Sequence, residues 1–392
     1  MFYNFVRLYV RLVFVFFCRS IRVNDEKIFQ EKGPLLLACN HPNSFLDAVL
    51  LGAKFNHPVH YLARGDAFKN PFVKKLLIAL KAIPIYRLKE GREYLSLNDT
   101  TFEKCSSILQ NGGIVLIFSE GLCMNQWELR PLKKGSARIA LTAWNKSVPE
   151  LKVIPVTLNY NSFRSFRKRI IIEFQQPIKK NDVSGNTEAG QINSFNQILF
   201  NKLHKGILIS TKEDKVVQFL LSNAGELTSS SSISRLKEIQ QKIDEESLRK
   251  DINILHEPGI LVFSKGSIFK KSIFIFLFSI PALCGYMLNY PIFYLLKKLI
   301  ARKTVNTVFY DSAFFAAILI VYPFYYLLIN LFSLLFIGND IIQLIIMIMP
   351  LLSLATFEVK DSLQGLANYF LLQRSSRLKL AEIIRNQGLD IN

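Results

Sequence analysis

The sequence predicts an α/β domain, in which helices cover a mixed sheet, followed by a C-terminal α-helical membrane domain. Between residues 34 and 176, short apolar runs alternate with helical stretches, as they do in a sheet covered by helices. From Ser272 onward, three apolar stretches are each near the length that crosses a hydrocarbon core. A chain of 392 residues can also bury a full-sized core without disulfides.

The composition points toward lipid and anionic partners. Hydrophobic residues make up 50% of the chain and Phe occurs 32 times, which is rich for a soluble protein. The net charge of +19 suits an acidic membrane surface, a phosphorylated substrate or a nucleic acid. Nucleic acid is the weakest of these, because no zinc-finger spacing, helix-turn-helix signature or basic coiled coil occurs. Five cysteines without metal-like spacing indicate a reducing, cytoplasm-facing chain with no structural metal.

The first segment, residues 1–18, predicts an uncleaved helix in the headgroup layer of a membrane. Arg7 and Arg11 interrupt its apolar run, and no small-residue cleavage site follows, which argues against a signal peptide. The arginines lie one helical turn apart among large apolar residues, as in an interfacial helix. A membrane span is the alternative.

The next segments predict the sheet and a polar extension. The expected strands are Leu35–Cys39, Val59–Ala63, Ile114–Phe118, Val153–Asn159 and Ile170–Phe174. Residues 178–260 are more polar, with a Ser-rich break at 229–232 and then apolar residues at helical spacing among dense charges. This pattern predicts a solvated helical extension whose charges form an exposed face.

The apolar stretches at 272–296, 313–337 and 341–357 predict a multi-pass membrane domain. The first contains Pro281, Gly285, Asn289 and Pro291, which predict a re-entrant or bent hairpin, and the short 338–340 turn predicts a tight helical hairpin. Basic residues flank the first stretch and follow the last, whereas 338–340 has none, so all basic flanks can be cytoplasmic. A single straight first span is the alternative. The expected organisation is an interfacial helix at 1–30, the α/β domain at 31–180, the polar extension at 181–265, membrane helices in hairpins at 266–360 and a cytoplasmic tail at 361–392.

The string from Asn40 to Asp47, NHPNSFLD, carries the clearest chemistry. His41 precedes a proline and therefore lies just outside the helix that Pro42 opens, whereas Asp47 lies inside that helix. The His41 ring can then fold back toward the carboxylate. Such a dyad fixes the imidazole tautomer and leaves the second ring nitrogen to take a proton from a hydroxyl.

Four blocks together resemble the motifs of the glycerol phosphate and lysophosphatidic acid acyltransferase superfamily. After NHPNSFLD come AIPIYR at 82–87, FSEG at 118–121 and VIPV at 153–156, so the resemblance covers roughly residues 30–180. The usual first motif has four residues between His and Asp, but this chain has five. HPNSFLD is similar to the branch of fungal-type glycerol-3-phosphate and dihydroxyacetone phosphate acyltransferases. The resemblance implies a glycerolipid acyltransferase-like fold, an acyl-CoA or acyl-ACP donor and no cofactor.

The other blocks provide candidate substrate-binding residues. Arg87 can present a planar guanidinium to a phosphate, although a solvated strand-end arginine is the alternative. Glu120 can accept a hydrogen bond from a glycerol hydroxyl while Gly121 allows a sharp turn. Pro155 is expected either to shape the acyl-binding wall or to be purely structural.

One phosphate-binding arginine of the commoner family pattern is missing. Thr and Arg usually follow the Glu-Gly pair, but Leu122 and Cys123 stand here. The block RPLKKGSAR at 130–138 resembles the fungal-type branch, and Arg130 with Lys133 is expected to supply the lost charge. Arg64 is a further candidate, for which an ion pair with Asp66 is the alternative.

The expected function is transfer of a fatty acyl group from an acyl thioester to glycerol-3-phosphate or dihydroxyacetone phosphate, with His41 and Asp47 as catalytic residues. 1-Acylglycerol-3-phosphate is the alternative acceptor, and a catalytically silent lipid-binding scaffold is the alternative of another class. A transporter ranks third, because the apolar stretches lack the charges of a polar pathway. Membrane lipid is an expected partner and acyl carrier protein a further candidate. No metal, ATP or NAD is expected, because the remaining histidines lack a metal-binding setting and no glycine-rich nucleotide loop occurs.

Overall fold

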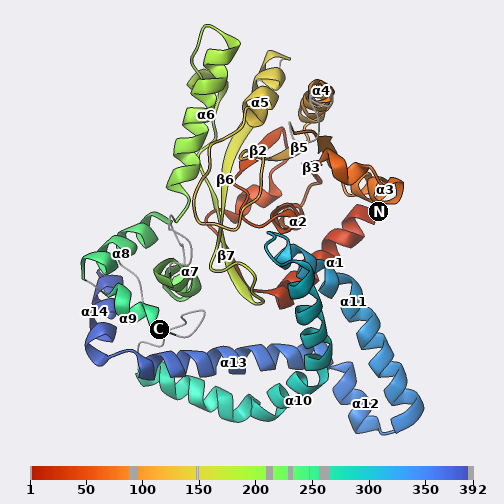
Figure 1. Cartoon of the computed structure of the whole chain (residues 1–392), viewed down its shortest axis with the longest axis vertical. Coiled ribbons are helices and arrows are strands. Elements are labelled where there is room, and N and C mark those ends of the chain that lie inside the picture. Colours follow the sequence, from red (N-terminus) through yellow and green to blue (C-terminus); the bar gives the residue numbers. More distant parts are fainter. Residues whose placement is uncertain are drawn as a thin grey trace.

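The computed structural model describes residues 2–87, 96–146, 148, 150–208, 215–227, 233–246, 248–255 and 265–386. A seven-stranded sheet lies at the centre of one half of the molecule, and long apolar helices form the other half (Figure 1). The strands follow the order β1-β7-β6-β2-β5-β3-β4. All neighbours are parallel except β6 and β7, which confirms the expected mixed sheet covered by helices.

Five of the seven strands lie where the sequence predicts them. The strands are β1 (Cys18–Val23), β2 (Leu35–Cys39), β3 (Val59–Arg64), β4 (Ala82–Ile85), β5 (Ile114–Phe118), β6 (Lys152–Tyr160) and β7 (Lys168–Phe174). Every residue of β2 is buried, because β5 and β6 flank it and helices cover both its faces. The short β4 was expected only as the strand before Arg87. β1 was missed, because CRSIRV mixes polar and apolar residues and pairs at the sheet edge.

Helices cover the sheet on both faces because the side chains of each strand alternate. Leu35 and Leu37 pack on one side, against α1 (Phe2–Phe17), α2 (Phe45–Lys54) and α11 (Tyr310–Phe332). Leu36 and Ala38 pack on the other, against α4 (Leu97–Gln110), α5 (Gly135–Asn145) and α6 (Glu188–Lys205). A further helix, α3 (Pro71–Ala79), lies between β3 and β4 in the chain.

The two N-terminal arginines form hydrogen bonds with the C-terminal end of α2. Arg7 donates to the carbonyl oxygens of Phe55 and Asn56, and Arg11 donates to those of Ala53, Lys54 and Phe55. These carbonyls are at the C-terminal end of α2, where a helix leaves its last acceptors unsatisfied. Another row of α1, formed by Phe2, Phe5, Leu8, Leu12 and Val15, is exposed and apolar, so the interfacial helix stays a prediction.

The polar extension packs with the C-terminal tail around a third apolar cluster, which also includes Trp127 and Ile171 of the α/β domain. It contains α7 (Lys215–Leu227), α8 (Ile233–Glu245) and α9 (Arg249–Asn253), and α14 (Arg374–Arg385) joins them. Leu236 and Ile239 of α8 are fully buried in the same cluster as Leu380 of α14. The charges of α8 do form an exposed face, but its apolar face is part of a packed unit.

The first membrane stretch is one continuous helix, α10 (Lys265–Lys303), which corrects the expected re-entrant or bent hairpin. Pro281 and Pro291 lie inside it, and neighbouring helices supply hydrogen bonds to its backbone. Thr356 donates to the Ala282 carbonyl at 2.8 Å, and Tyr325 donates to the Leu288 carbonyl at 2.6 Å. Gly285 permits close packing rather than breaking the helix, because a Cβ there would lie 2.3 Å from the Leu352 carbonyl oxygen.

The tight hairpin after α11 is confirmed. Gly338 has a φ of +61° and joins the end of α11, extended by a π-helical turn at Ser333–Ile337, to α12 (Asp340–Met347). The stretch 341–357 is broken, however, because α12 and α13 (Met349–Leu371) meet at a 65° bend. Within the part of the chain that the structure describes, two helices are long and apolar enough to cross a membrane, or three if the bent pair forms one span.

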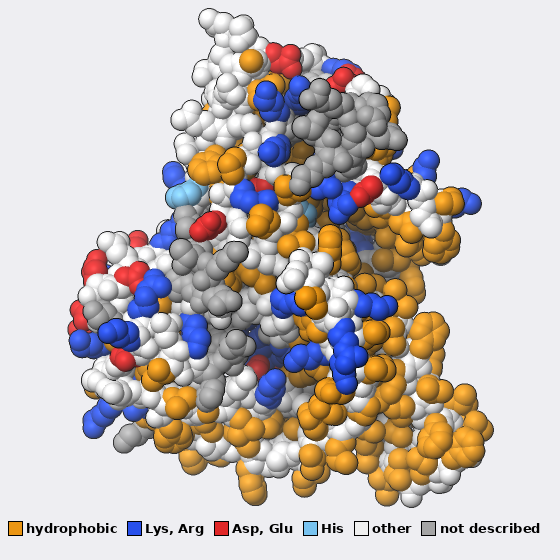
Figure 2. Space-filling view, in the orientation of Figure 1, with side chains coloured by type: hydrophobic (Ala, Val, Ile, Leu, Met, Phe, Trp, Pro, Cys, Tyr) orange, Lys and Arg blue, Asp and Glu red, His pale blue; other side chains and the backbone are white. Residues whose placement is uncertain are grey.

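Apolar side chains gather on the surface of these helices. Figure 2 shows them along the lower edge of the molecule, over α10 and α13, and at the lower right, over α11 and α12, whereas charged side chains predominate over α8, α9 and α14. Phe276 of α10 is 81% exposed and Phe336, beside the Gly338 turn, is 74% exposed. Such a large apolar surface is typical of contact with a membrane.

Candidate active site

His41 and Asp47 form a hydrogen-bonded dyad where β2 leads into α2. His41 Nδ1 lies 2.9 Å from Asp47 Oδ2, and the imidazole stacks on the ring of Phe118 at 3.8 Å between centroids. The His41 side chain keeps 16% of its surface exposed, whereas that of Asp47 is completely buried. An Nδ1–H that donates to Asp47 leaves Nε2 as the proton acceptor. The predicted folding back of the His41 ring is therefore present.

Asp47 accepts two further hydrogen bonds, which satisfy its buried carboxylate. The backbone N–H of Asn43 donates to Oδ2 at 2.8 Å, and the hydroxyl of Tyr160 donates to Oδ1 at 2.7 Å. A buried carboxylate needs such donors because it has lost its hydration. Burial and the neighbouring Asp47 raise the pKa of Tyr160 well above its usual value, so the hydroxyl remains a donor.

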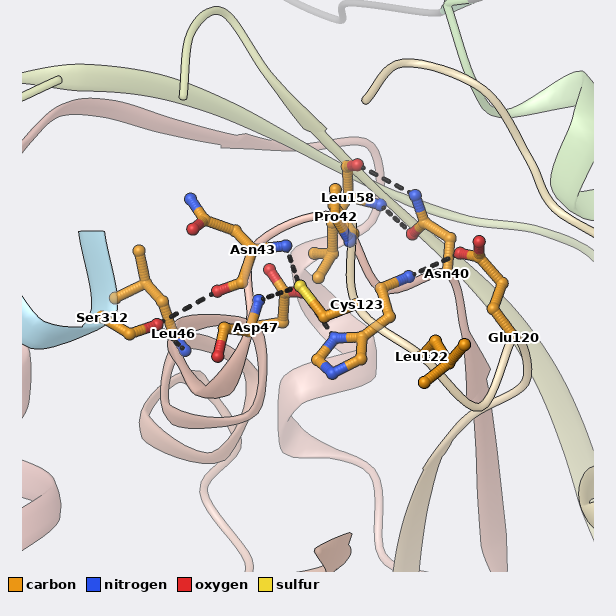
Figure 3. Close-up of polar contacts among 12 residues, drawn as sticks. Asn40, Pro42, Asn43, Leu46, Asp47, Glu120, Leu122, Cys123, Leu158 and Ser312 are labelled. Atoms are coloured by element: carbon orange, nitrogen blue, oxygen red, sulfur yellow. Dashed lines mark hydrogen bonds and ion pairs between the residues drawn. The ribbon is translucent and has the colours of Figure 1, made fainter. Parts of the chain in front are cut away.

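The loop between the two residues has an unusual backbone. Ser44, which precedes α2, has φ +53° and ψ −146°, outside the conformations that a residue with a side chain usually adopts. Its N–H donates to the Sγ of Cys123 at 2.7 Å, and Figure 3 shows Cys123 beside this loop. Burial raises the pKa of the Cys123 thiol, so this sulfur remains protonated.

Glu120 fixes the backbone of His41. Its Oε1 accepts the His41 N–H at 2.7 Å, and its Oε2 accepts Arg130 Nε at 2.9 Å (Figure 3 shows Glu120 beside the loop). Both oxygens thus already have protein donors, and only 4% of the residue is exposed. The expected hydrogen bond to a glycerol hydroxyl stays a prediction.

Arg130 reaches back to the segment that directly follows β5. Its guanidinium binds Glu120 and also donates to the carbonyl oxygen of Leu122, the first residue after the Glu-Gly pair. The structure therefore brings this positive charge next to the dyad, as the sequence predicts, although its phosphate role stays a prediction.

Gly121 and Lys133 lie against each other. Gly121 has a φ of +70°, and a Cβ there would lie 2.9 Å from Lys133 Cγ, so both conformation and space favour glycine. The N–H of Lys133 donates to the Ser119 carbonyl at 2.7 Å, which ties the segment after Arg130 to the end of β5. The Lys133 side chain is exposed. Lys133 thus lies beside Gly121 at the end of β5, the strand that pairs with β2.

Three other candidates lie further from the dyad. Arg87 follows β4, so it lies at the carboxyl ends of the parallel strands, as His41 does. The two strands β2 and β4 are three strand spacings apart, about 14 Å. Pro155 is buried in β6, and strand alternation places it on the face opposite to α2, between Ile154 and Val156, which pack toward α2. Their predicted roles remain untested. Arg64 forms an ion pair with Asp66, which was the expected alternative to phosphate binding.

Sequence reasoning missed several residues of the site. Tyr160 directly follows the predicted strand Val153–Asn159, and its hydroxyl reaches Asp47 because β6 lies beside β2. Ser312 comes from the start of α11 and contacts the loop between His41 and Asp47. Contacts across more than a hundred residues leave no local pattern, although a polar Asp-Ser pair directly before an apolar stretch was a visible signal. Within the ranges that the structure describes, no group of three or more His, Cys, Asp or Glu side chains could hold a metal ion.

Comparison with known proteins shows what the region around this site is similar to. Residues 20–159 match the acyltransferase family. The matched region contains the dyad, Glu120 and Arg130. We call residues 20–159 the acyltransferase-like domain. A 1-acyl-sn-glycerol-3-phosphate acyltransferase of Bacillus subtilis (strain 168) is 28% identical over 118 residues, which is 30% of this chain. The chain spans about half the length of that relative, 54%.

A solved structure is also similar to the chain at low identity. It is the crystal structure of the 1-acyl-sn-glycerophosphate (LPA) acyltransferase of Thermotoga maritima, with a TM-score of 0.38 and 14% identity. The similarity covers 52% of this chain and 78% of that one. The family match and the Bacillus subtilis relative support the superfamily expected from the four motifs, whereas the fungal-type branch stays a prediction.

Proposed function

We propose that the protein is a membrane-bound O-acyltransferase that moves a fatty acyl group from an acyl thioester to a hydroxyl of glycerol-3-phosphate or dihydroxyacetone phosphate. The observation that carries this proposal is the 2.9 Å contact between His41 Nδ1 and the buried Asp47, within the region that matches the acyltransferase family. The function would lie in phospholipid biosynthesis.

The dyad geometry suits general-base catalysis. Nε2 of His41 takes the proton of the acceptor hydroxyl as the oxygen attacks the thioester carbonyl carbon. The carbon–sulfur bond then breaks, and the leaving thiolate takes the proton back from His41. Asp47 stabilises the imidazolium through Nδ1, and such base catalysis contributes about 10²–10⁴ in rate. The reaction needs no cofactor, because the thioester itself is the activated donor.

The basic residues near the dyad can bind the acceptor phosphate. Arg130 is held beside His41 by Glu120, and Lys133 is next to Gly121, so we propose that one or both bind the phosphate. Arg87, at the same sheet edge, is the third candidate. Fixing the acceptor in this way would remove part of the entropic barrier of a two-substrate reaction.

The choice of acceptor has two candidates. The five-residue spacing in HPNSFLD favours glycerol-3-phosphate or dihydroxyacetone phosphate, because this motif resembles the branch of fungal-type acyltransferases that use these acceptors. The similarity to a protein named 1-acyl-sn-glycerol-3-phosphate acyltransferase favours the lysophospholipid acceptor. Acyl-CoA and acyl-ACP are both candidate donors.

We also propose that the active site faces the cytoplasm. The turn around Gly338 carries no basic residue, whereas Lys297, Lys298 and Arg302 precede α11 and Arg374 follows α13. The positive-inside bias then places the turn away from the cytoplasm and the acyltransferase-like domain within it. The α11–α12 hairpin and the exposed apolar face of α10 would hold the site near its lipid product.

Thiol release by detergent-purified protein tests the proposal. Palmitoyl-CoA or palmitoyl-ACP is offered as donor, with glycerol-3-phosphate, dihydroxyacetone phosphate, lysophosphatidic acid or no acceptor. We expect acceptor-dependent release that His41→Ala abolishes and that His204→Ala, a change at an exposed histidine of α6, leaves intact. Release with lysophosphatidic acid alone would support the second acceptor. No release with either donor would favour a catalytically silent lipid-binding scaffold.

A further inference from the structure

The first turn of the apolar helix α11 contacts the loop that carries the dyad. From this geometry we propose that Ser312 and Asp311 are positioning residues, which hold His41 and Asp47 in their catalytic arrangement only when α11 is docked. The inference rests on the proposed function. It concerns residues outside the matched region 20–159.

Ser312 binds the loop at two points. The N–H of Leu46 donates to Ser312 Oγ at 3.1 Å, and Ser312 Oγ donates to the carbonyl oxygen of Asn43 at 3.2 Å. In Figure 3, Ser312 lies on the side of the loop opposite to Glu120 and Leu122. Ser312 is fully buried, so water cannot replace it without a structural change.

Asp311 fixes the side chain of the same loop residue. Its Oδ2 accepts Asn43 Nδ2 at 2.8 Å and the N–H of Arg164 at 3.1 Å, and it forms a buried ion pair with Lys168. The backbone N–H of Asn43 in turn donates to Asp47 Oδ2, the oxygen that contacts His41. Asp311 and the catalytic imidazole are therefore linked through Asn43 and Asp47.

The loop needs this support because of its length and shape. Five residues separate His41 from Asp47, and the loop passes through the unfavourable angles of Ser44. Leu46 is at the start of α2, where its N–H has no partner within the helix. Ser312 supplies that partner in the place of an N-cap side chain, because Ser44 makes no side-chain cap.

This arrangement makes catalysis depend on a helix apolar enough to cross a membrane. Tyr310–Ile337 is such a helix, and its two leading polar residues reach into the acyltransferase-like domain. A displacement of α11 would leave the Leu46 N–H and the Asn43 amide without these partners. A shift of about 1 Å in a catalytic group can lower a rate by about 100-fold.

Ser312→Ala is the first test, with Ser353→Ala as its matched control. Ser353 is also buried in an apolar helix, but its hydroxyl donates to Pro350 of the same helix. We expect Ser312→Ala to lower kcat by about tenfold or more with little change in KM. Amide hydrogen exchange of the peptide that covers 43–47 should become faster, a readout that does not require activity. Ser353→Ala should change neither quantity.

The double variant Asp311→Leu with Lys168→Met tests the second contact. It removes both charges together, so no buried charge is left unpaired and the fold should persist. We expect the same loss of kcat and the same faster exchange in 43–47, with a thermal unfolding midpoint near that of the wild type.

The outcomes separate this inference from the proposed function. A wild-type protein without acyltransfer would sink the proposed function, and the exchange data would still report whether α11 holds the loop. An active wild type whose kcat and 43–47 exchange are unchanged in both variants would overturn the positioning role. A parallel change in Ser353→Ala would also overturn it, because the effect would then belong to general destabilisation.

Discussion

Tyr160 donates a hydrogen bond of 2.7 Å to Asp47 from a ring that is completely buried between β6 and α2. The two residues are 113 positions apart in the chain. Tyr160, the last residue of β6, thus connects this strand with the Asp47 carboxylate, and its high pKa keeps the hydroxyl protonated throughout the physiological range.

Tyr160→Phe should lower kcat by about tenfold, because the buried Asp47 loses one of three donors. A hydrogen bond to a charged group contributes about 1.5–3 kcal/mol. Steady-state kinetics and thermal unfolding measured together would check this, with Tyr86→Phe, away from the dyad, as the control. A variant with wild-type kcat would show that the remaining two donors suffice.

Glu120→Gln should lower the free energy of unfolding by about 1–3 kcal/mol, because His41 N–H and Arg130 bind different oxygens of Glu120 and an amide replaces one of these oxygens with a donor NH2. Glu103→Gln is the control. It removes an exposed ion pair with Lys146, which is worth at most about 1 kcal/mol. Denaturant titration of both variants measures the difference, and equal losses would contradict the structural role of Glu120.

Arg11→Met should destabilise the protein by about 1–2 kcal/mol, because several carbonyl oxygens at the end of α2 lose their donor. Arg64→Met removes an arginine whose pair with Asp66 is local and half-exposed, and it should cost less than about 0.5 kcal/mol. Thermal unfolding in the same detergent compares them. If the role of Arg11 were to bind lipid headgroups instead, Arg11→Met would weaken vesicle binding without loss of stability.

Glu173→Gln should stabilise the protein above pH 7 but not below pH 4.5. Burial raises the pKa of Glu173 from 4.5 to about 7, against the opposing effects of the Ile233 backbone and Lys237. Because the folded pKa is the higher one, the wild type loses stability as pH rises through this window and has lost all of this contribution above it. The gain should reach about 1–3 kcal/mol, at about 1.4 kcal/mol per pKa unit less solvent screening.

Unfolding curves between pH 4.5 and 8 check that prediction. Glu128→Gln, at an exposed position, is the control and should run parallel to the wild type. A stability difference between Glu173→Gln and the wild type that does not vary with pH would contradict the assigned pKa.

The sequence predicted those parts of the fold and site that depend on local pattern. The central strands are continuous apolar runs, so His41 and Glu120 could be placed at strand ends and Asp47 inside the helix that follows His41. The expectation that Pro42 opens this helix was wrong, because α2 begins at Phe45, after the bend through Asn43 and Ser44. Arg130 was placed through the family resemblance. Tyr160, Ser312 and Asp311 could not be assigned, because they contact the dyad loop through strand pairing and helix docking.

The membrane half was harder to predict for a related reason. Pro281, Gly285 and Pro291 were interpreted as breaks in a helix. The helix nevertheless continues through all three residues. Gly285 packs against the Leu352 carbonyl, and Thr356 and Tyr325 donate to α10 carbonyl oxygens close to the two prolines. A proline or glycine inside an apolar stretch therefore identifies a place where another helix packs closely as readily as it identifies a turn.

The contact between Ser312 and the dyad loop also orders events during biosynthesis. The ribosome adds Leu46 early, but Ser312, whose hydroxyl oxygen accepts the hydrogen bond of the Leu46 N–H, is added 266 residues later. At about 5–20 residues per second, the loop waits about 13–53 s for its partner. The nascent α/β domain therefore leaves the ribosome before the Ser312 hydroxyl is made, and this contact can form only once α11, a helix apolar enough to cross a membrane, has followed.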